Sequence, residues 1–231
     1  MILQNDIRKG VPKELEGKVK LFYADIPYGT GRAFQDFKDY RDDAKKVLVS
    51  LVHWLPRTLA PGGVGVIHCD WNMNWVVREL LEYQEELSFL NEVIWTYASG
   101  GAGKKRLPHK HDTLYVYYKK GGDYTFNVLR EPYPRDYGNR PGFHPEGRMC
   151  TSVWDIPILS TTSKERTGYS TEKPPKLLER LLLTFSNPGD LVYDPCCGSG
   201  VTGVAAKATG REYALSDINP EAIRISAKRL L

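Results

Sequence analysis

Hydrophobic residues along the chain alternate between short runs typical of strands and longer stretches with helical spacing. Residues 19–24 (VKLFYA) and 63–68 (GVGVIH) are short apolar runs with β-branched and aromatic residues, and they predict two buried strands. Between them, residues 40–60 place apolar side chains every three or four positions, which predicts an amphipathic helix. This strand–helix–strand order is typical of a mostly parallel sheet with helices on both faces.

The same alternation continues on either side of these elements. We expect further strands over 1–4, 92–97, 113–118, 191–193 and 212–216, and further helices over 74–87, 174–185 and 201–208. A last helix begins after Asn219, a residue type favoured as N-cap, with Pro220 at its first position. We expect that helix to turn Ile223, Ala227 and Leu230 toward the core.

Residues 121–170 lack this regularity. Pro, Gly, Arg and Tyr are frequent there, and the hydrophobic periodicity is poor. A long stretch of this kind inside a compact protein usually carries function. We therefore expect a single domain over 1–231 that contains an insertion over 121–170, rather than two folded domains.

Composition narrows the class of protein. The chain has 231 residues, of which 41% are hydrophobic and 26% charged, as in ordinary globular domains. We see no membrane-length apolar run and no signal peptide, and we expect a cytoplasmic protein without membrane association. The net charge of +4 is compatible with nucleic-acid binding but does not require it. The four cysteines form no CxxC pair and the five histidines show no ligand spacing, so we expect neither a disulfide framework nor a metal site.

A glycine-rich turn stands out near the end of the chain. Asp194-Pro-Cys-Cys-Gly-Ser-Gly200 follows a predicted strand and opens a predicted helix, where free N–H groups and a tight backbone favour a nucleotide-like ligand. The next strand ends at Asp217, whose carboxylate is placed to accept the hydroxyls of a ribose. The glycines alone do not separate a plain structural turn, a NAD site and an S-adenosylmethionine site. A second glycine-rich stretch, Ala98–Lys105, lacks the first glycine and the final Ser/Thr of a P-loop, and we reject it as a nucleotide site.

A second candidate site is Asp25-Ile26-Pro27-Tyr28, at the end of the strand over 19–24. An acidic side chain and a proline carbonyl can both accept hydrogen bonds from an aromatic amine, which frees its lone pair to attack a methyl group. A tyrosine ring can stack on a base drawn out of a duplex. A strand followed by a Pro-Tyr-Gly turn is the alternative reading of the same residues.

Together, the two motifs resemble those of the DNA amino-methyltransferases. Residues 25–28 resemble the family's D-P-P-Y motif, and residues 194–200 resemble its D-P-F-x-G-S-G motif. The order, with the catalytic motif first, matches the β-class circular permutation. The resemblance implies a Rossmann-like methyltransferase fold with a mostly parallel seven-stranded sheet, and S-adenosylmethionine as cofactor.

The resemblance covers nearly all of the chain and implies a set of site residues. Asn5-Asp6 resembles the site that bonds the cofactor's adenine, and Thr171-Glu-Lys-Pro174 resembles the T-x-K-P motif at its methionine end. The implied catalytic residues are Asp25, Pro27 and Tyr28. The implied cofactor-binding residues are Asp6, Ile7, Asp25, Thr171, Lys173, Pro174, Asp194, Pro195, Cys196, Cys197, Gly198, Ser199, Gly200, Asp217 and Ile218.

Three positions depart from the family pattern. Ile26 replaces the first proline of D-P-P-Y, Cys196 replaces the usual Phe, and Asp217 replaces the more usual Glu. Adenine-N6 enzymes of the family usually begin the catalytic motif with Asp, whereas cytosine-N4 enzymes usually begin it with Ser. Asp25 therefore favours N6 of adenine.

Duplex DNA is the expected substrate, and base flipping the expected way to reach the amine. The loop over 98–112 is rich in lysine and arginine, and the insertion occupies the position of the family's target-recognition region. The DNA-binding candidates are Arg32, Lys104, Lys105, Arg106, Lys110, Arg135 and Arg140. A cognate restriction endonuclease and a second copy of the chain are further partners that the resemblance suggests.

Three other functions remain open on the sequence. One is methylation of N4 of cytosine. The second is a methyltransferase that acts on RNA or a protein side chain, since related D/N-P-P-Y motifs occur in those classes. A DNA-binding protein with a decayed active site is the third, since Ile26 interrupts the catalytic motif.

Overall fold

One large β-sheet forms the centre of the protein. The computed structural model describes residues 1–31, 39–98, 105, 107–135, 140–160, 162–163 and 166–231. Strands of the central sheet are, in spatial order, β1 (Ile2–Gln4), β10 (Glu212–Asp217), β9 (Leu191–Asp194), β2 (Val19–Asp25), β3 (Leu59–Cys69), β5 (His111–Lys119), β4 (Leu87–Thr96) and β8 (Val153–Asp155). Among the strands in the described residues, β5 alone runs antiparallel to its neighbours in this sheet.

The remaining elements are the helices α1 (Arg41–Thr58), α2 (Asn74–Glu82), α3 (Pro175–Phe185), α4 (Val201–Ala208) and α5 (Pro220–Leu230), the 3-10 turns η1 (Ile7–Lys9) and η2 (Lys13–Leu15), and the short strands β6 (Arg130–Glu131) and β7 (Arg148–Met149). The expected α/β class and mostly parallel sheet are confirmed. None of the helices in the described part of the chain is both long and apolar enough to cross a membrane.

The sheet has eight strands in the described residues, whereas seven were expected. The additional strand, β8, comes from the segment over 121–170 and pairs in parallel with β4. Trp154 explains why this short piece joins the sheet, because its side chain is 3% exposed and lies opposite Trp95 in the register. A strand of three residues is too short to show an alternating pattern in sequence.

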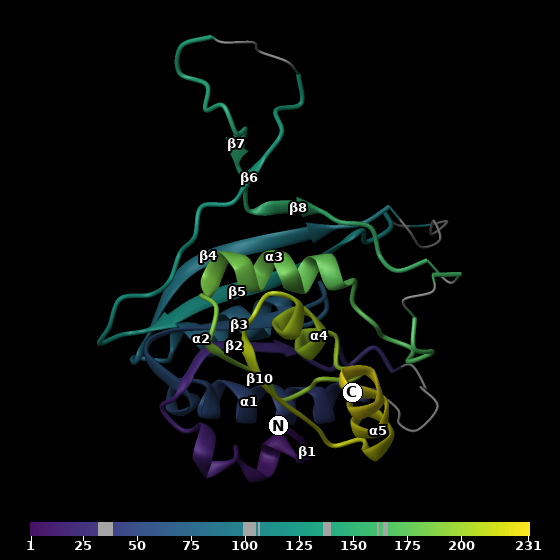
Figure 1. Ribbon diagram of the computed structural model, residues 1–231. Coiled ribbons are helices and arrows are strands. Elements are labelled where there is room, and N and C mark those ends of the chain that lie inside the picture. Colours follow the sequence, from purple (N-terminus) through teal and green to yellow (C-terminus); the bar gives the residue numbers. More distant parts are fainter. Residues whose placement is uncertain (32–38, 99–104, 106, 136–139, 161, 164–165) are drawn as a thin grey trace.

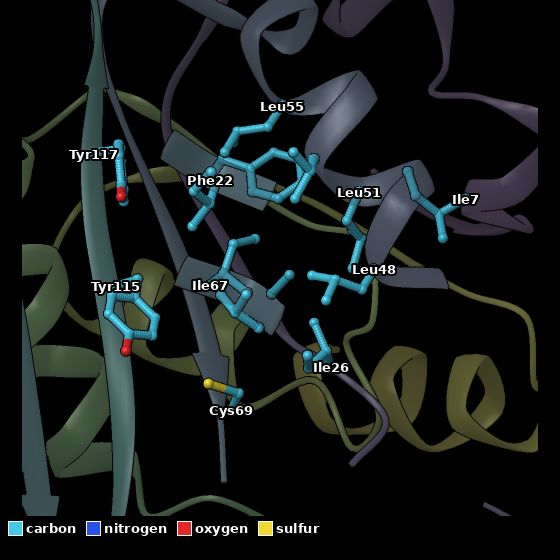
Figure 2. Close-up of a cluster of buried hydrophobic side chains, with 14 of the residues drawn as sticks. Ile7, Phe22, Ile26, Leu48, Leu51, Leu55, Ile67, Cys69, Tyr115 and Tyr117 are labelled. Carbon is cyan, nitrogen blue, oxygen red and sulfur yellow. The ribbon is translucent and has the colours of Figure 1, made fainter. Parts of the chain in front are cut away.

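Both faces of the sheet are buried, and strand alternation assigns side chains to each. On β2, Leu21 and Tyr23 pack on the side of α3 and α4, whereas Phe22 and Ala24 pack on the side of α1 and α2. Figure 2 shows the second side, where Leu48, Leu51 and Leu55 of α1 point toward the sheet. Each such buried side chain contributes roughly 1.5–3 kcal/mol to folding.

One predicted face was wrong. In α5, Ala227 is exposed and Ser226 is fully buried, one position away from the expectation. The Ser226 hydroxyl donates to the Gly198 carbonyl oxygen at 2.9 Å, so a small polar residue faces the core where α5 passes the glycine-rich turn. Ile223 and Leu230 pack against the sheet as predicted.

The parallel strands place their carboxyl ends along one edge of the sheet. In the register, Gln4 lies opposite Asp217, Leu215 opposite Asp194, and Asp25 opposite His68. Open α/β sheets bind ligands outside this edge. β6 and β7 pair as a hairpin that projects from the body of the protein, beyond β8 (Figure 1).

Candidate active site

Asp25, Tyr28 and Lys173 meet at the end of β2. The Tyr28 hydroxyl donates to Asp25 Oδ1 at 2.8 Å, and Lys173 Nζ donates to Asp25 Oδ2 at 2.6 Å and to the Tyr28 oxygen at 3.0 Å. Burial, followed by the nearby Asp25 and Asp112 charges, raises the pKa of Tyr28 well above its usual value, so the hydroxyl remains a donor. The site therefore holds a carboxylate with one ammonium and one hydroxyl directed at it.

The backbone around Tyr28 is held from three sides. Ile26 has an N–H, unlike proline, and donates it to the His68 carbonyl oxygen at 3.2 Å, while its side chain is 2% exposed in the core. Asn72 donates its side-chain amide to the Tyr28 carbonyl oxygen at 2.8 Å. Asp39 accepts the N–H groups of Gly29 and Thr30, both at 2.9 Å. These bonds fix the turn that presents Pro27 and Tyr28.

A buried histidine lies beneath this carboxylate. His68 is fully buried at the end of β3. Its Nε2 lies 3.2 Å from Asp112 Oδ2, its Nδ1 lies 2.8 Å from the Tyr23 hydroxyl, and Asp25 Oδ1 is 3.8 Å from the same Nδ1. Burial alone would raise the pKa of Asp112, but the hydrogen bond to His68, followed by the nearby charge of Lys173, lowers it.

The glycine-rich turn lies on β9, the neighbour of β2. Asp194 is 2% exposed and accepts hydrogen bonds from the Thr202 hydroxyl and from the Cys196 N–H. Burial raises the pKa of Asp194 to about 7, although those two bonds oppose the rise. The Gly198 N–H donates to Asp217 Oδ2 at 2.9 Å, which joins the turn to the end of β10.

Gly200 explains why this turn needs glycine. Its φ of +78° is in the left-handed region, and a Cβ there would lie 2.7 Å from Ser226 Oγ. Helix α5 can therefore pack directly on the turn. Five of the residues expected to bind the cofactor thus combine into one connected structure of turn, strand end and helix start: Asp194, Cys196, Gly198, Gly200 and Asp217.

Further residues that are expected to bind the cofactor lie at the same edge of the sheet. Asp6 follows β1 and accepts the Arg8 guanidinium and backbone N–H, and Ile7 is buried behind it. Asp217 is 9% exposed; each of its oxygens accepts a backbone N–H, from Gly198 and from Asn219. Burial raises the pKa of Asp217. Ile218, by contrast, is 53% exposed.

The segment before α3 connects the two halves of the site. Glu172, with a side chain 1% exposed, pairs with Arg229 of α5 at 2.8 Å. This ion pair anchors residues 171–174, and the adjacent Lys173 reaches Asp25. Pro174 is the buried N-cap residue of α3. Residues far apart in sequence thus place Lys173 over Tyr28, with Nζ 5.1 Å from the ring centre.

The two motifs therefore lie at the same sheet edge, on adjacent strands. Strand β2 pairs in parallel with β9, so Asp25 and Asp194 leave the sheet at the same edge. The sequence did not reveal the residues that surround Tyr28 and the turn after it, because only strand register and loop packing bring them there. These residues are His68, Asp112, Asn72 and Asp39.

The DNA-binding candidates are not gathered in one place. Lys105 and Lys110 lie between β4 and β5, at the same edge as Asp25. Arg135 and Arg140 lie on the projecting β6–β7 hairpin (Figure 1). Arg32, Lys104 and Arg106 are outside the described residues.

Sequence comparison identifies the family. The model of the N6/N4 methylase family, described as DNA methylase, matches residues 19–228, nearly the whole chain. The protein belongs to this family of DNA amino-methyltransferases, which act on N6 of adenine or N4 of cytosine.

Individual relatives agree with this membership. DNA adenine methyltransferase YhdJ of Escherichia coli (strain K12) is 29% identical over 96% of this chain and 78% of its own length. Type II methyltransferase M.HpaI of Haemophilus parainfluenzae is 29% identical over 93% of this chain and 69% of its own.

Solved structures show the same fold. The M1.HpyAVI–SAM complex aligns with a TM-score of 0.71 at 22% identity, covering 99% of this chain and 98% of its own. The cytosine-N4-specific PvuII DNA methyltransferase aligns with a TM-score of 0.77 at 15% identity, covering 100% of this chain and 86% of its own. The Rossmann-like methyltransferase fold expected from the motifs is thereby confirmed.

Proposed function

We propose that this protein transfers a methyl group from S-adenosylmethionine to N6 of adenine in duplex DNA. The observation that carries the proposal is the position of Asp25: a carboxylate at the end of β2, beside a tyrosine and next to the glycine-rich turn of β9. The family membership supplies the DNA amino group as acceptor.

The residues at the edge fit the proposed cofactor. Gly200, in the left-handed conformation, and Gly198 bring bare backbone to the start of α4, and Asp217 and Asp6 offer carboxylates for ribose and adenine. Asp194 and Lys173 complete the proposed site toward the methionine end. S-adenosylmethionine supplies an activated methyl on a sulfonium, so the chain needs no other activating group.

The catalytic roles follow from acceptor geometry. Each oxygen of Asp25 already accepts one hydrogen bond and keeps a further lone pair for an amine N–H. The Pro27 carbonyl is the second proposed acceptor, and the Tyr28 ring is the proposed stacking surface for a flipped base. Two acceptors on the amine favour the pyramidal nitrogen that attacks in line.

Adenine is the base we favour because the motif begins with Asp25 rather than serine. YhdJ, a DNA adenine methyltransferase by name, supports the same choice, whereas PvuII shows that cytosine-N4 enzymes share the fold. Ile26 supports an intact site, because its backbone is bonded to β3 and its side chain fills the core.

For DNA contact, we propose Lys105 and Lys110 as phosphate-binding residues beside the site and the segment over 121–170, with Arg135 and Arg140, as the target-recognition insertion. The separation of these two groups is compatible with a duplex that spans the edge and the hairpin, because phosphate contacts position DNA while base contacts specify it.

One experiment tests the proposal directly. The protein is incubated with methyl-labelled S-adenosylmethionine and duplex DNA, and the DNA is digested to nucleosides for mass spectrometry. We expect label in N6-methyldeoxyadenosine. Label in N4-methyldeoxycytidine would overturn the choice of base, and no label at full cofactor occupancy would support a decayed site. Parallel reactions with RNA test the remaining class of acceptor.

A further inference from the structure

A buried polar layer connects the proposed acceptor site to a histidine. On the α3 side of the sheet, β2, β3, β4 and β5 carry apolar residues in their interiors, but at the ligand edge the same face carries Asp25, His68, Tyr97 and Asp112. Strand register produces this layer, since Asp25 lies opposite His68 and Asp112 lies opposite Trp95. The face that these four strands share is therefore apolar in the interior of the sheet and ionisable at the ligand edge.

The layer contains a continuous hydrogen-bonded path. Asp25 Oδ1 accepts from the Tyr28 hydroxyl at 2.8 Å, the same hydroxyl lies 3.2 Å from Asp112 Oδ2, and Asp112 Oδ2 lies 3.2 Å from His68 Nε2. The Tyr97 hydroxyl donates to the other Asp112 oxygen at 3.0 Å. Every step is within hydrogen-bond distance, so a proton can pass along it without movement of the backbone.

Amine methylation produces one proton, and this part of the inference rests on the proposed function. The amine nitrogen forms a bond to the methyl carbon, the carbon–sulfur bond breaks, and its electron pair remains on sulfur. The product nitrogen then carries a positive charge until one of its protons leaves. The net charge is unchanged, but the positive charge moves from sulfur to the amine beside Asp25 and leaves with that proton.

The charges of the described residues in this layer favour uptake of the proton at His68. Two carboxylates, Asp25 and Asp112, face a single ammonium, Lys173. In the neutral imidazole Nδ1–H donates to the Tyr23 oxygen, which leaves the Nε2 lone pair facing Asp112 as the acceptor of a proton that arrives on that carboxylate. An imidazolium neutralises the second carboxylate, which a buried pair requires.

We propose that the His68–Asp112 pair receives the proton released by methyl transfer, through Asp25 and the Tyr28 hydroxyl. The groups that face His68 are Tyr23 and Asp25 of β2, Asp112 of β5, and Tyr28. Lys173 bonds to Asp25 and Tyr28, and Tyr97, which follows β4, bonds to Asp112. Two further buried carboxylates lie near the layer: Asp70, which follows β3 and interacts with Asp112, and Asp194 of β9, which interacts with Asp25.

The test measures single-turnover methyl transfer against pH for the wild type and His68→Gln. Glutamine keeps a donor for Asp112 but takes up no proton. We expect the wild-type rate to fall on acidification, once the relay already holds a proton, and the variant to be slowed at least about 10-fold, without that acid-side fall. Asp112→Asn is the second variant, and it should lower the rate and move the acid limb. His53→Gln, at an exposed histidine of α1, is the matched control and should match the wild type.

Thermal unfolding and cofactor binding of each variant separate loss of function from loss of fold. If His68→Gln does not fold, the decision falls to Asp112→Asn. A folded variant that keeps the wild-type rate within about twofold and keeps its acid limb would overturn the relay while leaving the proposed function intact. A wild type that methylates no DNA would overturn both.

Discussion

Ile26 shows what one residue of a motif contributes. Its side chain lies in the core beside Leu48 of α1 (Figure 2), and its N–H bonds to the His68 carbonyl oxygen of β3. The position serves the site through its backbone, so an apolar residue of suitable size replaces proline. The neighbouring Asp25, Pro27 and Tyr28 keep the groups that bear on the chemistry.

Asp25→Asn tests the charge of the proposed acceptor. Asparagine keeps an oxygen for Lys173 and for an amine but has no negative charge to balance the amine as it becomes cationic. We expect the single-turnover rate of methyl transfer to fall at least about 100-fold, with thermal unfolding nearly unchanged. A rate within about tenfold of the wild type would contradict the role assigned to the carboxylate.

Gly200→Ala tests the close approach of α5 to the glycine-rich turn. The new Cβ combines a positive φ with contact to Ser226, so we expect a loss of about 2–3 kcal/mol in the free energy of unfolding and weaker cofactor binding. Gly189→Ala is the control, because Gly189 has a φ of +84° and no atom within 4 Å of its Cβ position. That variant should lose only about 1 kcal/mol. Equal losses in the two variants, measured by denaturant titration, would show that packing is irrelevant.

At the scale of elements, the segment over 171–174 connects α5 to the proposed acceptor site. It belongs to no helix or strand except where Pro174 caps α3, yet it carries Lys173 to Asp25. Its anchor is the Glu172–Arg229 pair, which also brings Arg229 to the Ser199 hydroxyl of the turn. A substitution on α5 should therefore alter cofactor binding at the proposed site.

Arg229→Met tests this anchor while keeping the aliphatic stem. Glu172 would become a buried carboxylate without its partner, so we expect a loss of about 3 kcal/mol in stability and weaker cofactor binding. Arg224→Met, on the same helix, removes an exposed ion pair with Glu221 and should change neither. Calorimetric cofactor titrations and denaturant unfolding of both variants measure the difference; matching results would contradict the anchor.

Most helices and strands could be predicted because the hydrophobic residues in each repeat with the period of that element. The helix over Arg41–Thr58 and the strand over Val19–Asp25 bury a face that is visible in the local sequence. Strand β8 was missed because it has three residues and is stabilised by Trp154 packing rather than by a pattern. The burial of Ser226 was missed because its partner, the Gly198 carbonyl oxygen, lies 28 positions away in the chain.

At the scale of the whole molecule, ionisable residues are concentrated at one edge of an apolar sheet. Asp194 is the clearest case for stability. Because its folded pKa of about 7 exceeds the usual 3.8, the folded state binds more protons between these values, and stability falls as pH rises from about 4 to about 7. The full effect is on the order of 4 kcal/mol. In denaturant unfolding at several pH values, the stability of the wild type relative to Asp194→Asn should decline across that window; a flat or rising difference would contradict burial as the cause.

DNA binding is also a property of the whole surface. Lys105 and Lys110 lie at the ligand edge, whereas Lys18 precedes β2 at the opposite edge. Replacing either of the first two by alanine should weaken DNA binding and reduce the slope of log affinity against log salt by about 1. Lys18→Ala should leave both unchanged. Fluorescence anisotropy at several salt concentrations measures these slopes, and an equal effect of all three would argue against DNA at this edge.

The local sequence by itself determined the α/β class, the order of most strands and helices, and the two motifs, because periodicity, turn residues and short-range spacing are carried by neighbouring residues. Tertiary structure alone decided that Asp25 and the glycine-rich turn share an edge, that Lys173 reaches Asp25, and that His68 and Asp112 lie beneath them. The last two contacts join residues separated by 148 and 44 positions, and only strand register and the crossing of the chain over the sheet bring them together.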